Sequence, residues 1–325
     1  MSSSILNKIK DPISGELQKF ESHFRDAMKS NVPLLDKIMH YIVQKKGKQV
    51  RPMLVFLCAK TCGEINNSTY TAASLIELVH TASLVHDDVV DDSSMRRGAF
   101  SINALWKNKI AVIVGDYLLT KGLFIALDND EFEQLKILSK AVQQITEGEM
   151  LQMEKARRLD IKEDVYFDII KQKTASLIAA SCKAGAVSSS KDEKVIEAIH
   201  LFGEEIGIAF QIKDDIFDYG TNFIGKPRGI DIKEKKMTLP LIYALNKAEP
   251  SVKKKFIRYI KKDSKNKAKV KEIIDYVLQS GGIEYAQEKM MNYKASALSR
   301  IEFIPNSPAK ESLLALVDFI VERDN

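Results

Sequence analysis

Apolar residues recur along this chain at spacings of three and four, which places them on one face of an α-helix. Leu135, Leu138, Val142 and Ile145 form one such stripe, and a second runs through residues 195–206. No stretch alternates between apolar and polar residues in the way a half-buried strand does. The pattern therefore predicts helices of roughly 15–25 residues joined by short loops.

Proline is absent from positions 53–226, and helix interiors exclude proline. The segment 219–236 departs from the helical pattern, because three glycines and a proline lie there among charged residues. We expect a mobile loop that covers a site and becomes ordered when ligand binds. No linker is evident, so residues 1–325 are predicted to form one all-α domain, a large helical bundle around a central cavity.

Composition adds limits to this picture. The chain has 325 residues and a net charge of +5, with lysines concentrated between Lys253 and Lys271. We interpret those lysines as a solvated helix surface, and no nucleic-acid partner is expected without a basic patch that also carries aromatic residues.

Three cysteines, Cys58, Cys62 and Cys182, fit no zinc spacing. Cys58 and Cys62 lie four residues apart in an apolar segment and are interpreted as buried thiols. The odd number of cysteines and the absence of a signal peptide favour the cytoplasm. No apolar run is expected to span a membrane.

Two segments share the pattern D-D-x-x-D, at residues 87–91 and 214–218, and each follows an apolar helical stretch. The first and last aspartates of each cluster share a helix face, four residues apart. Clustered carboxylates repel one another, and divalent cations would relieve that repulsion. The predicted metal ligands are Asp87, Asp88, Asp91, Asp214, Asp215 and Asp218. We expect the two clusters to face each other.

Magnesium often binds through one or two carboxylates and is completed by substrate phosphates. Basic residues follow each cluster, Arg96 and Arg97 after the first and Lys226 and Lys236 after the second, so a diphosphate fits. Neither a Walker P-loop nor an EF-hand spacing occurs. One cluster alone would be interpreted as an ordinary acidic helix end. Two clusters, each followed by basic residues, indicate a metal–diphosphate site.

At these residues the chain resembles the trans-isoprenyl diphosphate synthases, or polyprenyl synthetases, and in particular the long-chain octaprenyl type. The likeness covers about residues 30–245, and it departs locally at Lys46 and Gln49. The matching segments are 47–52, 80–98, 115–118, 147–149, 173–174, 210–215, 225–227 and 236–240. The resemblance implies the isoprenoid synthase type I fold.

The resemblance also implies residue roles. The aspartates would bind Mg²⁺, roughly three ions per active site, bridging an allylic diphosphate. That diphosphate would be held by Arg96, Lys173, Lys226 and Lys236, and isopentenyl diphosphate by Lys48, Arg51, His80 and Arg97. Ionisation gives an allylic carbocation that the second substrate attacks before a proton is lost. Thr174 and Gln211 would turn oxygen dipoles toward the cation. A homodimer and peripheral membrane contact for product release are also implied.

Product length is predicted from the residues one turn before Asp87, Ala82 and Ser83, whose small side chains leave a tunnel open. A long-chain product of about hexaprenyl to decaprenyl length is therefore expected. The small residues could instead only permit close helix packing. The remaining alternatives are a short-chain (farnesyl or geranylgeranyl) synthase, a terpene cyclase, or a non-catalytic lipid-binding subunit. Cyclases typically carry Asn, Ser and Glu in the second motif, and a non-catalytic subunit would lose site residues that are all present here.

Overall fold

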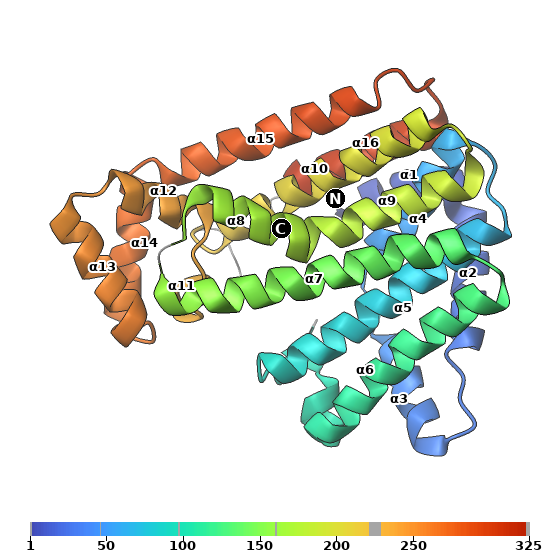
Figure 1. Ribbon diagram of the computed structural model, residues 1–325, viewed down its shortest axis with the longest axis horizontal. Helices are drawn as coiled ribbons and strands as arrows, with labels where there is room; N and C mark the ends of the chain where they lie inside the picture. The colour runs from blue at the N-terminus through green and yellow to red at the C-terminus, as the bar shows by residue number, and fades with distance from the viewer. Residues whose placement is uncertain (1, 46, 97, 160, 221–228, 323–325) are drawn as a thin grey trace. The chain divides into compact units, whose positions relative to one another are not determined.

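The computed structural model describes residues 2–45, 47–96, 98–159, 161–220 and 229–322 (Figure 1). Helices dominate these ranges, where the strands found are β1 (Met95–Arg96) and β2 (Ala99–Phe100), a two-residue antiparallel pair. The all-α prediction is confirmed. The chain forms two compact units, which are described separately, and a single domain stays a prediction.

Unit 1 comprises Met1–Val142, Ala180–His200 and Phe303–Leu316. Its N-terminal part runs through α1 (Ser2–Lys10), η1 (Asp11–Ile13), α2 (Ser14–Ala27), α3 (Pro33–Gln44) and α4 (Val50–Cys62). Two long helices follow, α5 (Asn67–Val90) and α6 (Ile102–Asp128). A capping box between Asn66 and Thr69 starts α5, and the first aspartate cluster ends it.

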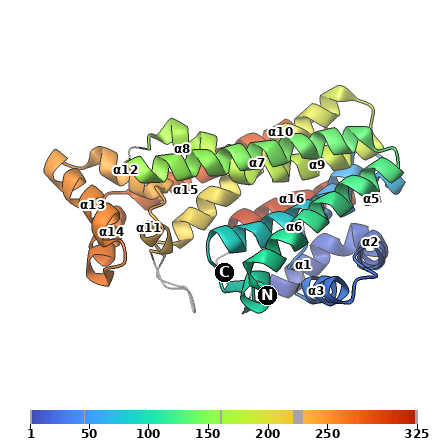
Figure 2. The same ribbon diagram turned by 60° about the horizontal axis from the view of Figure 1, so that its bottom comes forward.

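The α5 and α6 helices lie side by side in both views (Figures 1 and 2). Two glycines of α6 permit this approach. A Cβ atom at Gly115 would lie 2.1 Å from Nε2 of His86, and one at Gly122 would lie 3.2 Å from Cδ1 of Leu75. The close packing leaves the opposite side of α6 uncovered within unit 1.

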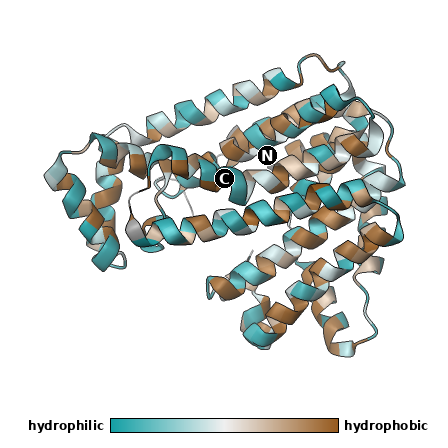
Figure 3. Ribbon diagram, viewed as in Figure 1, coloured by the Kyte–Doolittle hydropathy of each residue, from teal (hydrophilic) through white to brown (hydrophobic). Residues whose placement is uncertain are grey.

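The α6 helix contradicts the expectation that no apolar run could span a membrane. By length and composition α6 could cross a membrane, since its most apolar 18-residue window has a mean hydropathy of 1.8. Only 33% of that window is buried, and Figure 3 shows α6 as largely hydrophobic. The prediction that no apolar run reaches this length was wrong because few charges interrupt α6. One such helix is weak evidence of a membrane span, because core helices of soluble proteins can match it.

Unit 2 comprises Gln143–Ala179, Leu201–Glu302 and Val317–Asn325. Its own helices are α8 (Glu163–Ile170), the π-helical turn η2 (Lys171–Ala175), α11 (Ile230–Lys233), α12 (Leu239–Lys247), α13 (Pro250–Asp263), α14 (Lys267–Gln279) and α15 (Gly282–Arg300). Gly282 lets α15 approach α12, because a Cβ atom there would lie 2.6 Å from the carbonyl oxygen of Pro240. Lysines of α13 such as Lys253, Lys254 and Lys261 are exposed, as predicted for a solvated surface.

Four helices contribute residues to both units: α7 (Phe132–Arg158), α9 (Ser176–Ser189), α10 (Glu193–Phe217) and α16 (Pro308–Glu322). The buried-thiol prediction is confirmed for Cys58, whereas Cys62 is only half-buried. Cys182 is also buried. Burial, followed by the charge of Cys182, raises the pKa of the Cys62 thiol to about 12. All three cysteines are free thiols.

Candidate active site

The first aspartate cluster lies at the C-terminal end of α5, and its three carboxylates differ in surroundings. Asp88 is only 3% exposed, whereas Asp87 is half-buried and Asp91 is exposed. Arg96 donates from Nε and Nη2 to Oδ1 of Asp88, at 2.7 and 2.6 Å. The backbone carbonyl of Asp88 accepts from Asn103 at 3.1 Å. The middle aspartate therefore holds Arg96. Arg96 lies on β1, and the β1–β2 pair places it close to the C-terminal end of α5.

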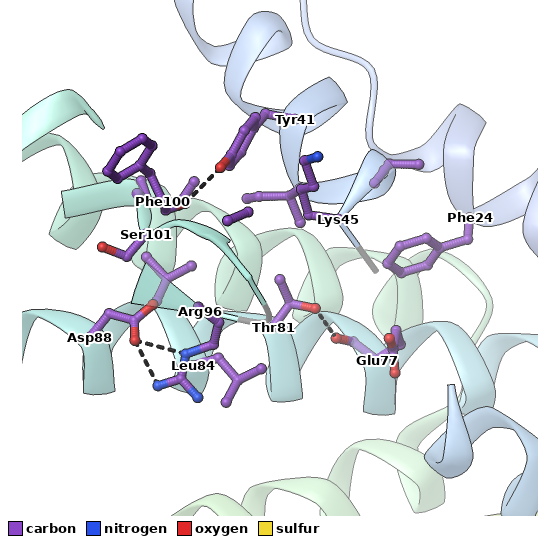
Figure 4. A pocket seen from close by; sticks show the side chains of 15 residues that line it. Phe24, Tyr41, Lys45, Glu77, Thr81, Leu84, Asp88, Arg96, Phe100 and Ser101 are labelled. Atoms are coloured by element: carbon purple, nitrogen blue, oxygen red, sulfur yellow. Dashed lines mark hydrogen bonds and ion pairs between the residues drawn. The ribbon is translucent and has the colours of Figure 1, made fainter. Parts of the chain in front are cut away.

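The same ion pair closes one end of a cavity of about 80 Å³ in unit 1 (Figure 4). Mostly aromatic and aliphatic side chains from α2, α3, α5 and the β1–β2 pair line the rest of it, together with Lys45, Glu77, Thr81 and Ser101. The hydroxyl of Tyr41 donates to the carbonyl of Phe100 at 2.6 Å and ties α3 to β2. The sequence interpretation did not identify this cavity, because its lining comes from segments distant in the chain.

Two residues predicted to bind isopentenyl diphosphate are neighbours in unit 1. Nη1 of Arg51, on α4, lies 2.9 Å from Nε2 of His80 on α5. Lys48 is exposed just before α4. His86 differs from His80, because its Nε2 lies 3.3 Å from the carbonyl oxygen of Val112 in the α5–α6 contact. The same nitrogen lies 3.5 Å from Oδ1 of Asp116, so His86 joins α5 to α6.

The second cluster belongs to unit 2, at the end of α10, and its middle aspartate is also the buried one. Asp215 accepts from the hydroxyl of Tyr166 at 2.7 Å on Oδ2 and from Nε2 of Gln211 at 2.8 Å on Oδ1. Oε1 of Gln211 in turn accepts from the hydroxyl of Thr174 at 2.8 Å. Thr174 and Gln211, predicted to act together, are therefore joined in one hydrogen-bonded series.

This series depends on a close contact between α10 and η2. A Cβ atom at Gly207 would lie 2.5 Å from Cα of Ala175, so only glycine lets the two backbones approach. Because the hydroxyl of Thr174 donates its only proton to Gln211, both lone pairs of the hydroxyl oxygen stay available to accept or to face positive charge. Such an oxygen can face a positively charged carbon.

The outer carboxylates of the second cluster also differ. Asp214 is exposed, whereas Asp218 accepts from the backbone amides of Ile230 and Asp231, at 2.9 and 3.2 Å, at the start of α11. Burial and then the charge of Asp231 raise the pKa of Asp215 to about 7. Burial and then the charge of Asp218 raise the pKa of Asp231 to about 6. The sequence interpretation missed Asp231, although it follows the cluster closely.

A cavity of about 190 Å³ in unit 2 gathers the predicted catalytic residues. Nζ of Lys173 lies 2.5 Å from Oε2 of Glu149, and Nζ of Lys236 lies 2.5 Å from Oε2 of Glu234. The glycine before Glu149 permits the first pair, because a Cβ there would lie 2.9 Å from the backbone nitrogen of Lys173. The predicted or charged residues of the lining are Lys173, Thr174, Gln211, Asp215, Asp231, Lys235 and Lys236.

The donor set fits Mg²⁺, which prefers oxygen ligands and takes one or two carboxylates together with substrate phosphates. Within the described residues, no group of three or more His, Cys, Asp or Glu side chains already surrounds a common metal position. The predicted residues Arg97 and Lys226 lie outside the described residues.

The predicted chain-length residues lie on α5 in unit 1. Ala82 is fully buried, and helical spacing places it on the face of Leu75 and Leu78, which contact Gly122 of α6. Ser83 is half-buried. The burial of Ala82 agrees with the packing alternative, and both its packing role and its role in product length stay predictions.

Comparison with known proteins follows this geometry. The family model described as polyprenyl synthetase matches residues 32–277. Octaprenyl diphosphate synthase of Escherichia coli is 31% identical over 98% of this chain and 99% of its own length. A short chain isoprenyl diphosphate synthase of Methanothermobacter thermautotrophicus is 33% identical over 94% of this chain and 95% of its own length.

A solved structure gives the same result. A polyprenyl synthase from Caulobacter crescentus, crystallised with calcium and isoprenyl diphosphate, has a TM-score of 0.91 and 31% identity, covering 98% of both chains. The chain belongs to the polyprenyl synthetase family, and it is an enzyme of the prenyltransferase class. The predicted family and helical isoprenoid synthase fold are confirmed.

Proposed function

We propose that this enzyme condenses isopentenyl diphosphate with an allylic diphosphate and releases a long-chain trans-polyprenyl diphosphate of about hexaprenyl to decaprenyl length. The observation that carries the proposal is the cavity of unit 2, where Lys173, Thr174 and Gln211 lie together with Asp215 and Lys236. A cationic, dipolar and acidic set of this kind suits ionisation of a carbon–diphosphate bond.

Bound Mg²⁺ would supply charge neutralisation for the leaving diphosphate. The carboxylates that would hold it are Asp87, Asp88 and Asp91 in unit 1 and Asp214, Asp215 and Asp218 in unit 2. Lys173 and Lys236 would hold diphosphate oxygens, and Arg96 would do so from the first cluster. The oxygen of Thr174, oriented by its donation to Gln211, would stabilise the allylic cation. The double bond of isopentenyl diphosphate would attack that cation, which forms a carbon–carbon bond and a tertiary carbocation. The released diphosphate would then take a proton from the carbon next to this cation, and the electrons of that C–H bond would form the new double bond.

The carboxylate partners of the basic residues support this scheme. Glu149 and Glu234 hold the ammonium groups of Lys173 and Lys236 near the cavity of unit 2. A diphosphate entering the cavity would replace those carboxylates as the partner. The lysines are thus kept in place before substrate arrives, which lowers the cost of ordering them.

A short-chain product is the second candidate, because a relative named as a short chain synthase is as similar as the octaprenyl enzyme. The small residues Ala82 and Ser83 favour the long product. We also propose a cytoplasmic homodimer that touches membranes only to release product, with no nucleic-acid partner. The exposed apolar side of α6 supports a partner surface.

The test is incubation of the purified chain alone with Mg²⁺, isopentenyl diphosphate and farnesyl diphosphate, followed by chromatography of the products. We expect chains beyond geranylgeranyl length. Asp87→Ala and Asp214→Ala should each lower turnover by several orders of magnitude, because a lost ligand misplaces charge at the leaving group. Near-normal turnover in both variants, a cyclic hydrocarbon product, or activity only with a second subunit would contradict the proposal.

A further inference from the structure

Tyr166 of α8 is a buried residue that none of the roles above uses. It is 4% exposed, and its hydroxyl donates to Oδ2 of Asp215 at 2.7 Å, across 49 residues of sequence. Its ring packs edge-on against Phe167, with centroids 5.3 Å apart. The ring therefore belongs to the core of unit 2, whereas the hydroxyl reaches the second aspartate cluster.

The hydroxyl completes the fixation of the Asp215 carboxylate. Gln211 holds Oδ1 and Tyr166 holds Oδ2, so the carboxylate cannot rotate without breaking one of two hydrogen bonds. Both donors are uncharged, so they orient the carboxylate but leave its negative charge to be met by cations. An arginine or lysine in the place of Tyr166 would instead neutralise it.

The orientation of Asp215 also determines that of its neighbours. Because Nε2 of Gln211 donates to Asp215, its Oε1 points to Thr174 and accepts the hydroxyl proton. A carboxylate free to rotate would release Gln211, whose amide could then turn over. Thr174 would lose the acceptor that keeps its lone pairs available.

We propose that Tyr166 is a positioning residue, whose hydroxyl fixes Asp215 and, through Gln211, the hydroxyl of Thr174 for ionisation of the allylic diphosphate. The inference rests on the proposed function and deepens it. It predicts that removing the hydroxyl weakens the enzyme's response to Mg²⁺ and diphosphate. The aromatic ring without its hydroxyl is expected to be sufficient for the fold.

The experiment compares Tyr166→Phe with Tyr285→Phe, a matched control. Tyr285 of α15 also donates to a carboxylate, Oε1 of Glu163 at 2.6 Å, but does not line the cavity of unit 2. Removal of a residue that orients a metal-binding carboxylate typically costs about 10- to 100-fold in activity or metal affinity. We expect Tyr166→Phe to lower kcat in that range and to raise the Mg²⁺ concentration needed for half-maximal rate. Tyr285→Phe should change neither.

A second readout is independent of turnover. Thermal unfolding is followed with and without Mg²⁺ and inorganic diphosphate, and the ligand-induced rise in Tm should shrink in Tyr166→Phe but not in Tyr285→Phe. This shift tests Tyr166 even if the wild-type enzyme makes no polyprenyl product, an outcome that would sink the proposed function alone. An equal Tm for the ligand-free variants excludes a folding defect.

A double variant tests the route of the effect. If the hydroxyl acts through Asp215, adding Tyr166→Phe to Asp215→Asn should lower kcat and the ligand-induced Tm shift little further. Full additivity of the two substitutions would overturn the inference. A Tyr166→Phe enzyme with wild-type kcat, Mg²⁺ response and ligand-induced Tm shift would overturn it as well.

Discussion

Each aspartate cluster buries its middle carboxylate and fixes it with donors from another part of the same unit. In the first cluster the donor is Arg96, whose side chain is 35% exposed while that of Asp88 is 5% exposed. Asp88 therefore differs from Asp87 and Asp91, which are more open to a metal. We infer that Asp88 serves to hold Arg96 toward the diphosphate.

The first prediction concerns Asp88→Asn. Loss of the carboxylate charge should release Arg96 and raise the KM for the allylic diphosphate about tenfold, a loss of roughly 1.4 kcal/mol in binding. The Tm should fall as well, because the ion pair that the buried Asp88 carboxylate makes with Arg96 is lost. Asp91→Asn is the control, since its exposed carboxylate should leave Tm unchanged. Steady-state kinetics and thermal unfolding measure both effects, and an Asp88→Asn enzyme with wild-type KM would contradict this role.

The second prediction concerns Ala82→Phe. If the growing chain passes this position, the phenyl ring should shorten the product, as seen by chromatography. The side chain is fully buried beside α6, so the ring must displace neighbours and Tm should fall by several degrees. Ser83→Phe, at a half-buried position, is the less disruptive companion. Unshortened chains from both folded variants would show that the tunnel does not pass here.

At the scale of single residues, the sequence identifies which chemical groups form the site, but not which hydrogen-bond or ion-pair partner each group has. The spacing of the aspartates and their basic followers predicted a diphosphate site, because i and i+4 positions on a helix are fixed by local geometry. The partners of the buried aspartates could not be predicted. Tyr166 meets Asp215 across 49 residues, and only tertiary packing brings them together.

Among the elements, α11 is tied most directly to the site. Its first amides, those of Ile230 and Asp231, donate to the two oxygens of Asp218. This is an N-terminal cap supplied by a residue predicted to bind metal. A metal that takes Asp218 as a ligand would compete with those amides.

The third prediction follows from this competition. Adding Mg²⁺ and inorganic diphosphate should change hydrogen exchange at Ile230 and Asp231, because their acceptor changes while Lys236 exchanges Glu234 for the diphosphate. The loop predicted over 219–236 includes residues 221–228, which lie outside the described residues. Exchange measured by mass spectrometry across 219–236 tests the predicted response of this loop to ligand. Peptides from α15 provide the internal control, and unchanged exchange throughout 219–236 would contradict the expected closure.

Helix existence was predictable from periodicity, but several elements were not. The β1–β2 pair contains two residues per strand, too short for any alternation to show. The π-helical turn η2 places Lys173 near Glu149, and its form depends on contacts with α7 and α10 rather than on local propensity. Short elements at functional sites are determined by packing, which a single sequence does not display.

For the molecule as a whole, the exposed side of α6 is the main surface that unit 1 leaves unexplained. Ile113 and Phe124 are 54% and 60% exposed, and other large apolar residues of α6 are exposed beside them. Contiguous exposed apolar surface of this kind usually marks an interface. Lys109 and Asp116 lie on the same helix with opposite charges, so a second copy of this surface would be electrostatically acceptable.

The fourth prediction is that this surface holds the homodimer together. Ile113→Glu combined with Phe124→Glu should convert a dimer to monomers in sedimentation velocity, because charged residues at the centre of an apolar interface lack partners. Met291→Glu on α15, where the wild-type side chain is 44% exposed, should leave the dimer intact. Both substituted side chains are on the surface, so the monomeric double variant should remain folded, with a helix content and a Tm close to those of the wild-type protein. A wild-type enzyme that sediments as a monomer, or that binds lipid vesicles through α6 instead, would contradict this assignment.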